Sequence, residues 1–236
     1  GDASMHPDGR AYGIYNDSSK EIHFGPSLAV FDVKGAEATG IYAGNNREGV
    51  KSSIQVYGNL LFNLDGSRTT GVEAGKNGEV VDHEYLEWAG PAMVSIDVNV
   101  NSPHGYGLYA HDGGVIRLGK ATISSGLADA VYAERGGRIT FATDSYTGNL
   151  KTDGDENSHI RTTILKSMRG DALGHVGMKL GAKASWEGSA SSLTDLTLGN
   201  DSVWHVGRAG DIRLPVLSGS NGNIHMNRGG GDLSVG

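Results

Sequence analysis

The stretch LTLGNDSVWHV (196–206) is followed 20 residues later by VLSGSNGNIHM (216–226), which superposes on it without a gap. The shift aligns apolar residues with apolar residues, glycine with glycine and histidine with histidine. The aligned pairs are Leu196 with Val216, Gly199 with Gly219, Trp204 with Ile224, His205 with His225 and Val206 with Met226. A fixed period of this length is typical of proteins in which one short unit stacks on the next.

A second repeat runs through the first 140 residues. Its copies are YGIYNDSS (12–19), TGIYAGNN (39–46), TGVEAGKNGEV (70–80), YGLYAHDGGVI (106–116) and DAVYAERGGRI (129–139). One position of the repeat is held in turn by Tyr15, Tyr42, Glu73, Tyr109 and Tyr132. The spacing ranges from 23 residues (109 to 132) to 36 residues (73 to 109), which indicates a constant unit with insertions. We expect these tyrosines to stack on one another or to lie at a rim.

Within each copy, apolar and polar residues alternate over short stretches, as at 54–56 (IQV), 116–118 (IRL) and 139–141 (ITF). Alternation at period two predicts half-buried strands of about 4–6 residues. Clusters of Gly, Asn, Asp and Ser separate them and supply turns. No sustained helical pattern is present, because glycine interrupts nearly every candidate window.

Short strands that repeat every 20–25 residues or so predict an all-β fold, a parallel β-helix. Parallel crossovers are nearly always right-handed, so we expect a right-handed coil of about ten turns. The whole chain, 1–236, would form one domain, with its most regular coils at 184–236. The predicted core of the last coils contains Leu196, Val203 or Trp204, Val206, Leu214, Val216 and Leu217.

The amino-acid composition excludes some classes of function. The 236 residues include 20 Lys and Arg against 27 Asp and Glu, so the formal net charge is −7. This balance argues against a nucleic-acid partner, which normally meets a basic surface. The 38 glycines suit a chain that turns tight corners in every coil, and the sequence has no cysteine. No apolar run reaches the roughly 20 residues of a membrane-spanning helix. We predict no cofactor and no metal.

The last 46 residues, 191–236, resemble the β-helix of pertactin-like bacterial autotransporter passengers. The family's recurrent order is a Leu-x-Leu strand, then Asn or Asp with Ser, then Trp-x-Val; here these are LTL (196–198), NDS (200–202) and WHV (204–206). The GIYA, GLYA and AVYA tags look like upstream coils of such passengers. The resemblance implies a type V secreted passenger, either released or displayed at the outer-membrane surface. It also implies that the signal peptide and the C-terminal translocating barrel are absent from this sequence.

The function implied by the resemblance is binding to host cells, as an adhesin or as a ligand of a cell-surface receptor. Self-association of passengers, leading to aggregation or biofilm, is one alternative. A glycan-active β-helix enzyme is another, and its candidate cluster is Asp129, Glu134, Arg135 and Asp144. We expect binding rather than catalysis.

The most specific candidate for receptor binding is Arg169-Gly170-Asp171, the tripeptide that integrins bind in their ligands. The alternative is a structural corner, because residues 170–173 align with Ala128-Asp129-Ala130-Val131. A second candidate is the pair Tyr85 and Trp88, exposed-looking aromatics in the insertion 82–92. The other long insertions are 44–52, 99–106 and 151–160.

Catalytic and metal motifs are incomplete. The string nearest to a serine-protease nucleophile is GNDS (199–202), which lies inside the structural phrase of the repeat. HEYLE (83–87) lacks the second histidine of a zinc motif, and DGDEN (153–157) lacks the later glycine and glutamate of a calcium loop. We therefore predict no catalytic residue and a solvated turn at 153–157. His205 and His225 are expected to stack as an exposed ladder.

Overall fold

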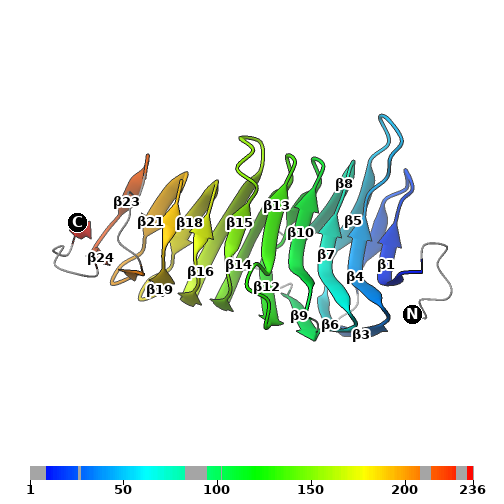
Figure 1. Ribbon diagram of the computed structural model, residues 1–236, viewed down its shortest axis with the longest axis horizontal. Coiled ribbons are helices and arrows are strands. Elements are labelled where there is room, and N and C mark those ends of the chain that lie inside the picture. Colours follow the sequence, from blue (N-terminus) through cyan, green and yellow to red (C-terminus); the bar gives the residue numbers. More distant parts are fainter. Residues whose placement is uncertain are drawn as a thin grey trace.

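The computed structural model describes residues 9–25, 28–82, 95–101, 103–207, 214–226 and 233–235. In these residues the fold is all-β, with three sheets and no helix (Figure 1). The strands lie side by side along the long axis, from the N-terminal to the C-terminal end. No helix in the described part is long and apolar enough to cross a membrane.

Sheet I has eight strands. In spatial order they are β1 (Ala11–Asn16), β4 (Glu37–Ala43), β7 (Arg68–Ala74), β10 (Gly105–His111), β13 (Val131–Glu134), β15 (Leu150–Thr152), β17 (Ala172–Leu173) and β20 (Ala190–Ser191). Sheet III has four strands: β12 (Lys120–Ser125), β9 (Ser95–Asn101), β6 (Asn59–Asp65) and β3 (Leu28–Lys34).

Sheet II has thirteen strands. Its main path is β2 (Ile22–Phe24), β5 (Ser52–Val56), β8 (Gly78–Asp82), β11 (Val115–Arg117), β14 (Arg138–Thr147), β16 (His159–Arg169), β19 (Ser185–Gly188), β22 (Val203–Val206), β24 (Gly222–Met226) and β25 (Leu233–Val235). A branch leaves β16 and continues as β18 (Val176–Leu180), β21 (Asp195–Leu198) and β23 (Leu217–Gly219).

The strand pairing follows the repeat. Every described pair is parallel except β24 with β25. Up to β22, each strand pairs with one that the chain reaches only after visiting another sheet, whereas β21–β23, β22–β24 and β24–β25 pair without leaving sheet II. This topology is compatible with a β-helix. The predicted alignment of the five tag copies is confirmed: Tyr15, Tyr42, Glu73, Tyr109 and Tyr132 are successive partners in sheet I.

The C-terminal repeat is confirmed in β22 and β24 but is wrong by one residue in β21 and β23. Trp204 pairs with Ile224, as predicted, whereas Leu196 pairs with Leu217 rather than with Val216. The reason is that the chain is one residue shorter from Gly219 to Asn223 than between their register partners, Leu198 and Val203. Val216 is accordingly 54% exposed and does not belong to the core.

The core is a continuous set of inward-facing apolar side chains. Leu196, Trp204 and Val206 belong to it as predicted, and Leu214 and Leu217 pack against it while partly exposed. Ring contacts join neighbouring strands inside it: Trp186 and Trp204 stack with centroids 4.4 Å apart, and Phe31 lies 4.8 Å from Phe62. Burial of such large rings is the main stabilising contribution in a chain without disulfides.

Candidate interaction surface

Six half-buried tyrosines lie on sheet I, and we call them the tyrosine surface. They form two groups of three: Tyr12, Tyr15 and Tyr42 on β1 and β4, and Tyr106, Tyr109 and Tyr132 on β10 and β13. In the second group the ring centroids are 4.5 Å (106 to 109), 5.4 Å (106 to 132) and 6.0 Å (109 to 132) apart. In the first group Tyr15 stacks on Tyr42 at 5.2 Å.

The tag explains why two tyrosines of one strand lie together. Between Tyr106 and Tyr109 come Gly107 and Leu108, and both of these residues are buried. A Cβ on Gly107 would lie 2.5 Å from the Ile123 side chain, so only glycine fits against the core here. With two consecutive residues inward, the tyrosines on either side lie outside the core, and their rings meet.

A carboxylate at the edge of the second group joins two of its hydroxyls. Glu134 accepts hydrogen bonds from Tyr109 at 2.6 Å and from Tyr132 at 3.2 Å, and it also pairs with Arg135. Burial, together with the charge of Glu134, raises the pKa of Tyr132 to about 12 and that of Tyr109 further. Both hydroxyls therefore stay protonated at neutral pH and serve as donors.

Charged residues border the tyrosines at the corners between sheets I and II. Asp112 and Arg135 occupy equivalent corners, each with a positive φ, of 52° and 48°. The Arg135 guanidinium donates two hydrogen bonds to Asp112, at 2.6 and 3.1 Å, and holds the pKa of that carboxyl well below its usual range. On the next strand, Lys151 lies 5.9 Å from the ring centre of Tyr132 and pairs with Asp129 at 2.7 Å.

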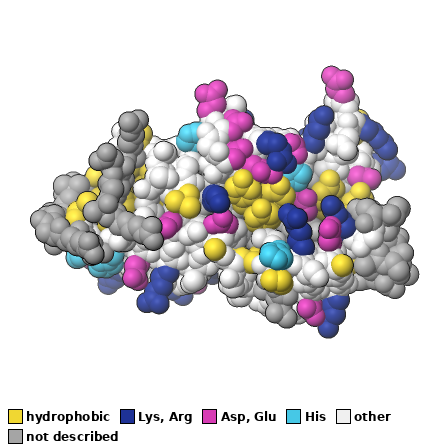
Figure 2. Space-filling view, in the orientation of Figure 1, with side chains coloured by type: hydrophobic (Ala, Val, Ile, Leu, Met, Phe, Trp, Pro, Cys, Tyr) yellow, Lys and Arg dark blue, Asp and Glu magenta, His cyan; other side chains and the backbone are white. Residues whose placement is uncertain are grey.

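This distribution of side chains is visible in Figure 2, where apolar and aromatic side chains gather near the middle of the view and both signs of charge lie around them. An aromatic centre with a charged border is the usual anatomy of a protein-binding patch. Tyrosine and arginine are also the residue types that most often dominate binding energy.

His111 connects the tyrosines to the charged border. Its ring stacks on Tyr109 at 4.6 Å, its Nε2 lies 3.2 Å from Glu73, and its Nδ1 lies 2.7 Å from Asp112. Burial alone would lower the pKa of His111. Hydrogen bonds to the two carboxylates outweigh burial, so its pKa is raised above the ordinary 6.5.

We expect the His111 contacts to stabilise the fold in a pH-dependent way. Because the folded pKa is the higher one, the stabilisation is complete below about pH 6.5 and is lost as the pH rises through the folded pKa. Urea unfolding of the parent chain and of His111→Gln between pH 5 and pH 9 measures it. The two free energies of unfolding should differ most at the acid end and converge at the alkaline end. A difference that stays constant with pH would contradict this assignment.

The structure places Arg169, Gly170 and Asp171 at a corner between β16 and β17. The Arg169 side chain is 78% exposed and its Nε lies 3.5 Å from Glu187. Gly170 has a φ of 137°. Asp171 is half-buried; its N–H donates to Asn149 at 2.9 Å, and one carboxylate oxygen accepts from the N–H of Ser189 at 2.8 Å.

The expected alignment of this corner is wrong by one residue, because Ala172, and not Leu173, shares a register position with Leu150 and Val131. The neighbouring corners are nevertheless linked, since Asn149 also donates to Asp129 at 2.9 Å. Asp171 therefore has a structural partner on each side, while the tripeptide as an integrin motif stays a prediction. Tyr85 and Trp88 lie outside the described residues.

The carboxylates proposed above as a glycan-active cluster are each held in ion pairs. Asp144 lies between Lys120 at 3.3 Å and Lys166 at 3.0 Å, Asp129 pairs with Lys151, and Glu134 pairs with Arg135. The described residues contain no group of three or more His, Asp or Glu that could hold a metal ion. The 153–157 loop is an exposed turn in which Asp153 and Asp155 accept bonds from backbone N–H groups.

No family model, curated protein or solved structure matches the chain. The tyrosine surface therefore has to be interpreted from its own chemistry. Sequence reasoning found the row Tyr15, Tyr42, Tyr109 and Tyr132 but missed that Tyr12 and Tyr106 join it. The signal was the Tyr-Gly pair that opens the first and fourth tags.

Proposed function

We propose that the chain is a right-handed parallel β-helix of about ten coils that binds a protein on the surface of host cells through the tyrosine surface. In this proposal it is the extracellular passenger part of a pertactin-like autotransporter, released or displayed at the bacterial surface. The parallel strand order and the 20-residue C-terminal register support the fold. The resemblance of 191–236 to such passengers supports the setting.

The observation that carries the binding function is the grouping of tyrosines inside a charged border. Tyr106, Tyr109 and Tyr132 stack face to face, so their ring faces contact each other. A sugar that packs on an aromatic residue needs an open ring face, which these stacked tyrosines do not offer, whereas a protein partner packs against ring edges and hydroxyls. The fixed ion pairs of Arg135 with Asp112 and of Lys151 with Asp129 supply a charged rim that orients such a partner.

Binding of the purified chain to cultured epithelial and endothelial cells tests the proposal. We expect Tyr109→Ala and Tyr132→Ala each to weaken binding about thirtyfold, the effect of losing a contact of about 2 kcal/mol. Tyr57→Ala is the matched control, because Tyr57 stacks on His23 away from the tyrosine surface and should leave binding unchanged. Circular dichroism confirms that each variant is folded.

Two other results would favour a different binding site or a different function. Full binding by both tyrosine variants, with loss in Asp171→Glu, would contradict the tyrosine surface and favour an integrin at 169–171. Absence of cell binding, with concentration-dependent association of the chain itself, would instead favour the self-association alternative. In that case sedimentation velocity would show dimers or larger species that Tyr109→Ala abolishes.

A further inference from the structure

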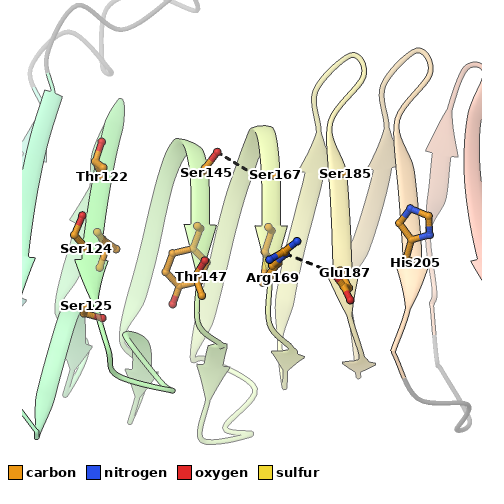
Figure 3. A pocket seen from close by; sticks show the side chains of 13 residues that line it. Thr122, Ser124, Ser125, Ser145, Thr147, Ser167, Arg169, Ser185, Glu187 and His205 are labelled. Atoms are coloured by element: carbon orange, nitrogen blue, oxygen red, sulfur yellow. Dashed lines mark hydrogen bonds and ion pairs between the residues drawn. The ribbon is translucent and has the colours of Figure 1, made fainter.

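A groove of about 730 Å³ opens on the side of the molecule where sheet III ends. The last strand of sheet III, β12, pairs only with β9 among the described strands. On that side the second halves of β14 and β16 follow, and then β19 and β22 (Figure 3). The groove therefore lies between two sheets, with β12 of sheet III on one side and β14, β16, β19 and β22 of sheet II on the other.

A β-bulge in β16 contributes to this change of surface. Thr143 pairs with Ile164, but Ser145 pairs with Ser167, so β16 has one more residue than β14 over this interval. A bulge bends its strand and increases the local twist. After the bulge, β16 pairs with β19, whereas before it β16 pairs with β18. The residues past the bulge thus form a face of their own.

Two rows of polar side chains run along this face. The first is a hydroxyl row, Ser145, Ser167 and Ser185, in which the Ser167 hydroxyl donates to Ser145 at 3.0 Å. The second row is Thr147, Arg169, Glu187 and His205, which are all exposed. Figure 3 shows Arg169 directed toward Glu187, with Ser124 and Ser125 on β12 across the groove. Successive members lie one strand spacing apart, about 4.8 Å.

The chemistry of the lining selects its ligand. Seven of the thirteen lining residues are serine or threonine, and each hydroxyl both donates and accepts hydrogen bonds. Arg169 and Glu187 form a pair, so their charges balance. The apolar lining residues Ile123, Tyr146 and Met168 are all buried, and so offer little surface to a ligand. Sites for apolar small molecules are lined mainly by hydrophobic side chains. This groove is instead lined mainly by polar side chains, so it suits a ligand that is rich in hydroxyls.

We propose that the groove binds a neutral, unbranched oligosaccharide that lies along the strand-stacking direction. Such a chain carries hydroxyls at regular intervals, and the two rows meet it with hydroxyls and with the Arg169–Glu187 pair. The serine and threonine hydroxyls of the groove form hydrogen bonds with the sugar hydroxyls. The Arg169–Glu187 pair provides the stronger, charge-assisted hydrogen bonds. This site is separate from the tyrosine surface, and binding is non-covalent.

An array that displays neutral oligosaccharides of host type and bacterial glucans, with sialylated and sulfated glycans beside them, tests the proposal. Calorimetric titration with the neutral glycan that gives the strongest signal then quantifies the site. We expect Ser167→Val to weaken this binding about fivefold and Arg169→Ala about tenfold or more. The host and bacterial arms of the array identify the source of the glycan.

Arg161→Ala is the matched control. Arg161 lies on the same strand, is 72% exposed and lies 3.9 Å from Asp195, but it is outside the groove. It should leave glycan binding unchanged, as should Tyr109→Ala, which separates this proposal from the proposed cell-surface function.

Four results would overturn the inference. The first is an array on which no neutral glycan binds, and the second is neutral-glycan binding that survives both groove variants. The third is binding of sialylated or sulfated glycans alone that is abolished by added salt. Such binding would depend on the negative charge of the glycan and not on its hydroxyls. A peptide that pairs with the edge of β12 would also contradict it, and would appear as peptide binding on a display library with no glycan signal.

Discussion

The Trp186→Ala variant should lose about 4 kcal/mol of its free energy of unfolding, the usual cost of truncating a fully buried aromatic ring. Trp186 has no exposed surface and stacks on Trp204 at an interplanar angle of 5°. Its Nε1 donates to the carbonyl of Gly170 at 2.8 Å. Alanine at this position removes the ring contact and leaves both a cavity and an unpaired carbonyl. Urea denaturation followed by tryptophan fluorescence and circular dichroism measures the loss.

Two companion variants separate the causes of this effect. Trp186→Phe keeps an aromatic ring but loses the bond to Gly170, so we expect a smaller cost of about 1–2 kcal/mol. Glu187→Ala, the exposed neighbour on the same strand, should change stability by less than about 0.5 kcal/mol. Equal losses in Trp186→Ala and Glu187→Ala would contradict the inward placement of the ring.

The parts of the fold that the sequence predicts are those in which one copy of the repeat has the same length and pattern as the next. The tag row Tyr15, Tyr42, Glu73, Tyr109 and Tyr132 aligns correctly because each residue occupies the same place before the same kind of corner. The predicted pairing of His205 with His225 on neighbouring strands is confirmed for the same reason, but their rings meet edge to face, 5.0 Å apart at 89°, and are not stacked.

Register fails where corners differ in length. Counted between register partners, the connection after β23 is one residue shorter than the connection after β21, and a one-residue difference moves side chains to the opposite face of a strand. Val216 was therefore expected in the core, although Leu217 occupies the paired position. Neither turn carries a sequence signal that fixes its length.

The candidate sites were predictable only in part, because each depends on contacts between residues that lie far apart in the sequence on neighbouring strands. The tyrosine row is visible in the sequence, but the ion pair of Arg135 with Asp112 joins residues 23 positions apart. The groove depends on the end of sheet III at β12 and on the bulge in β16, neither of which has a periodic pattern. Arg169 was found as part of a tripeptide, whereas its partner Glu187 was not.

Gly71→Ala should be destabilising by about 3 kcal/mol, at the upper end of what overpacking a core normally costs. A Cβ at this position would lie 2.4 Å from the carbonyl oxygen of Gly107 and 2.4 Å from a methyl carbon of Val98. The first contact is with the backbone of the adjacent strand, so a change of rotamer cannot relieve it. The β7–β10 pairing must separate locally, and Val98 must also move to relieve the second contact.

Gly126→Ala is the control for this substitution. No atom lies within 4 Å of a Cβ at Gly126, and its φ is not in the positive range. Alanine there should be neutral or slightly stabilising, because it restricts the unfolded chain more than the folded one. Thermal unfolding and amide hydrogen exchange distinguish the two variants. Exchange should accelerate in β7 and β10 for Gly71→Ala alone, since the clash acts on the hydrogen bonds between these strands. Equal stability of the two variants would mean that β7 and β10 do not approach each other as closely at Gly71 and Gly107 as the structure shows.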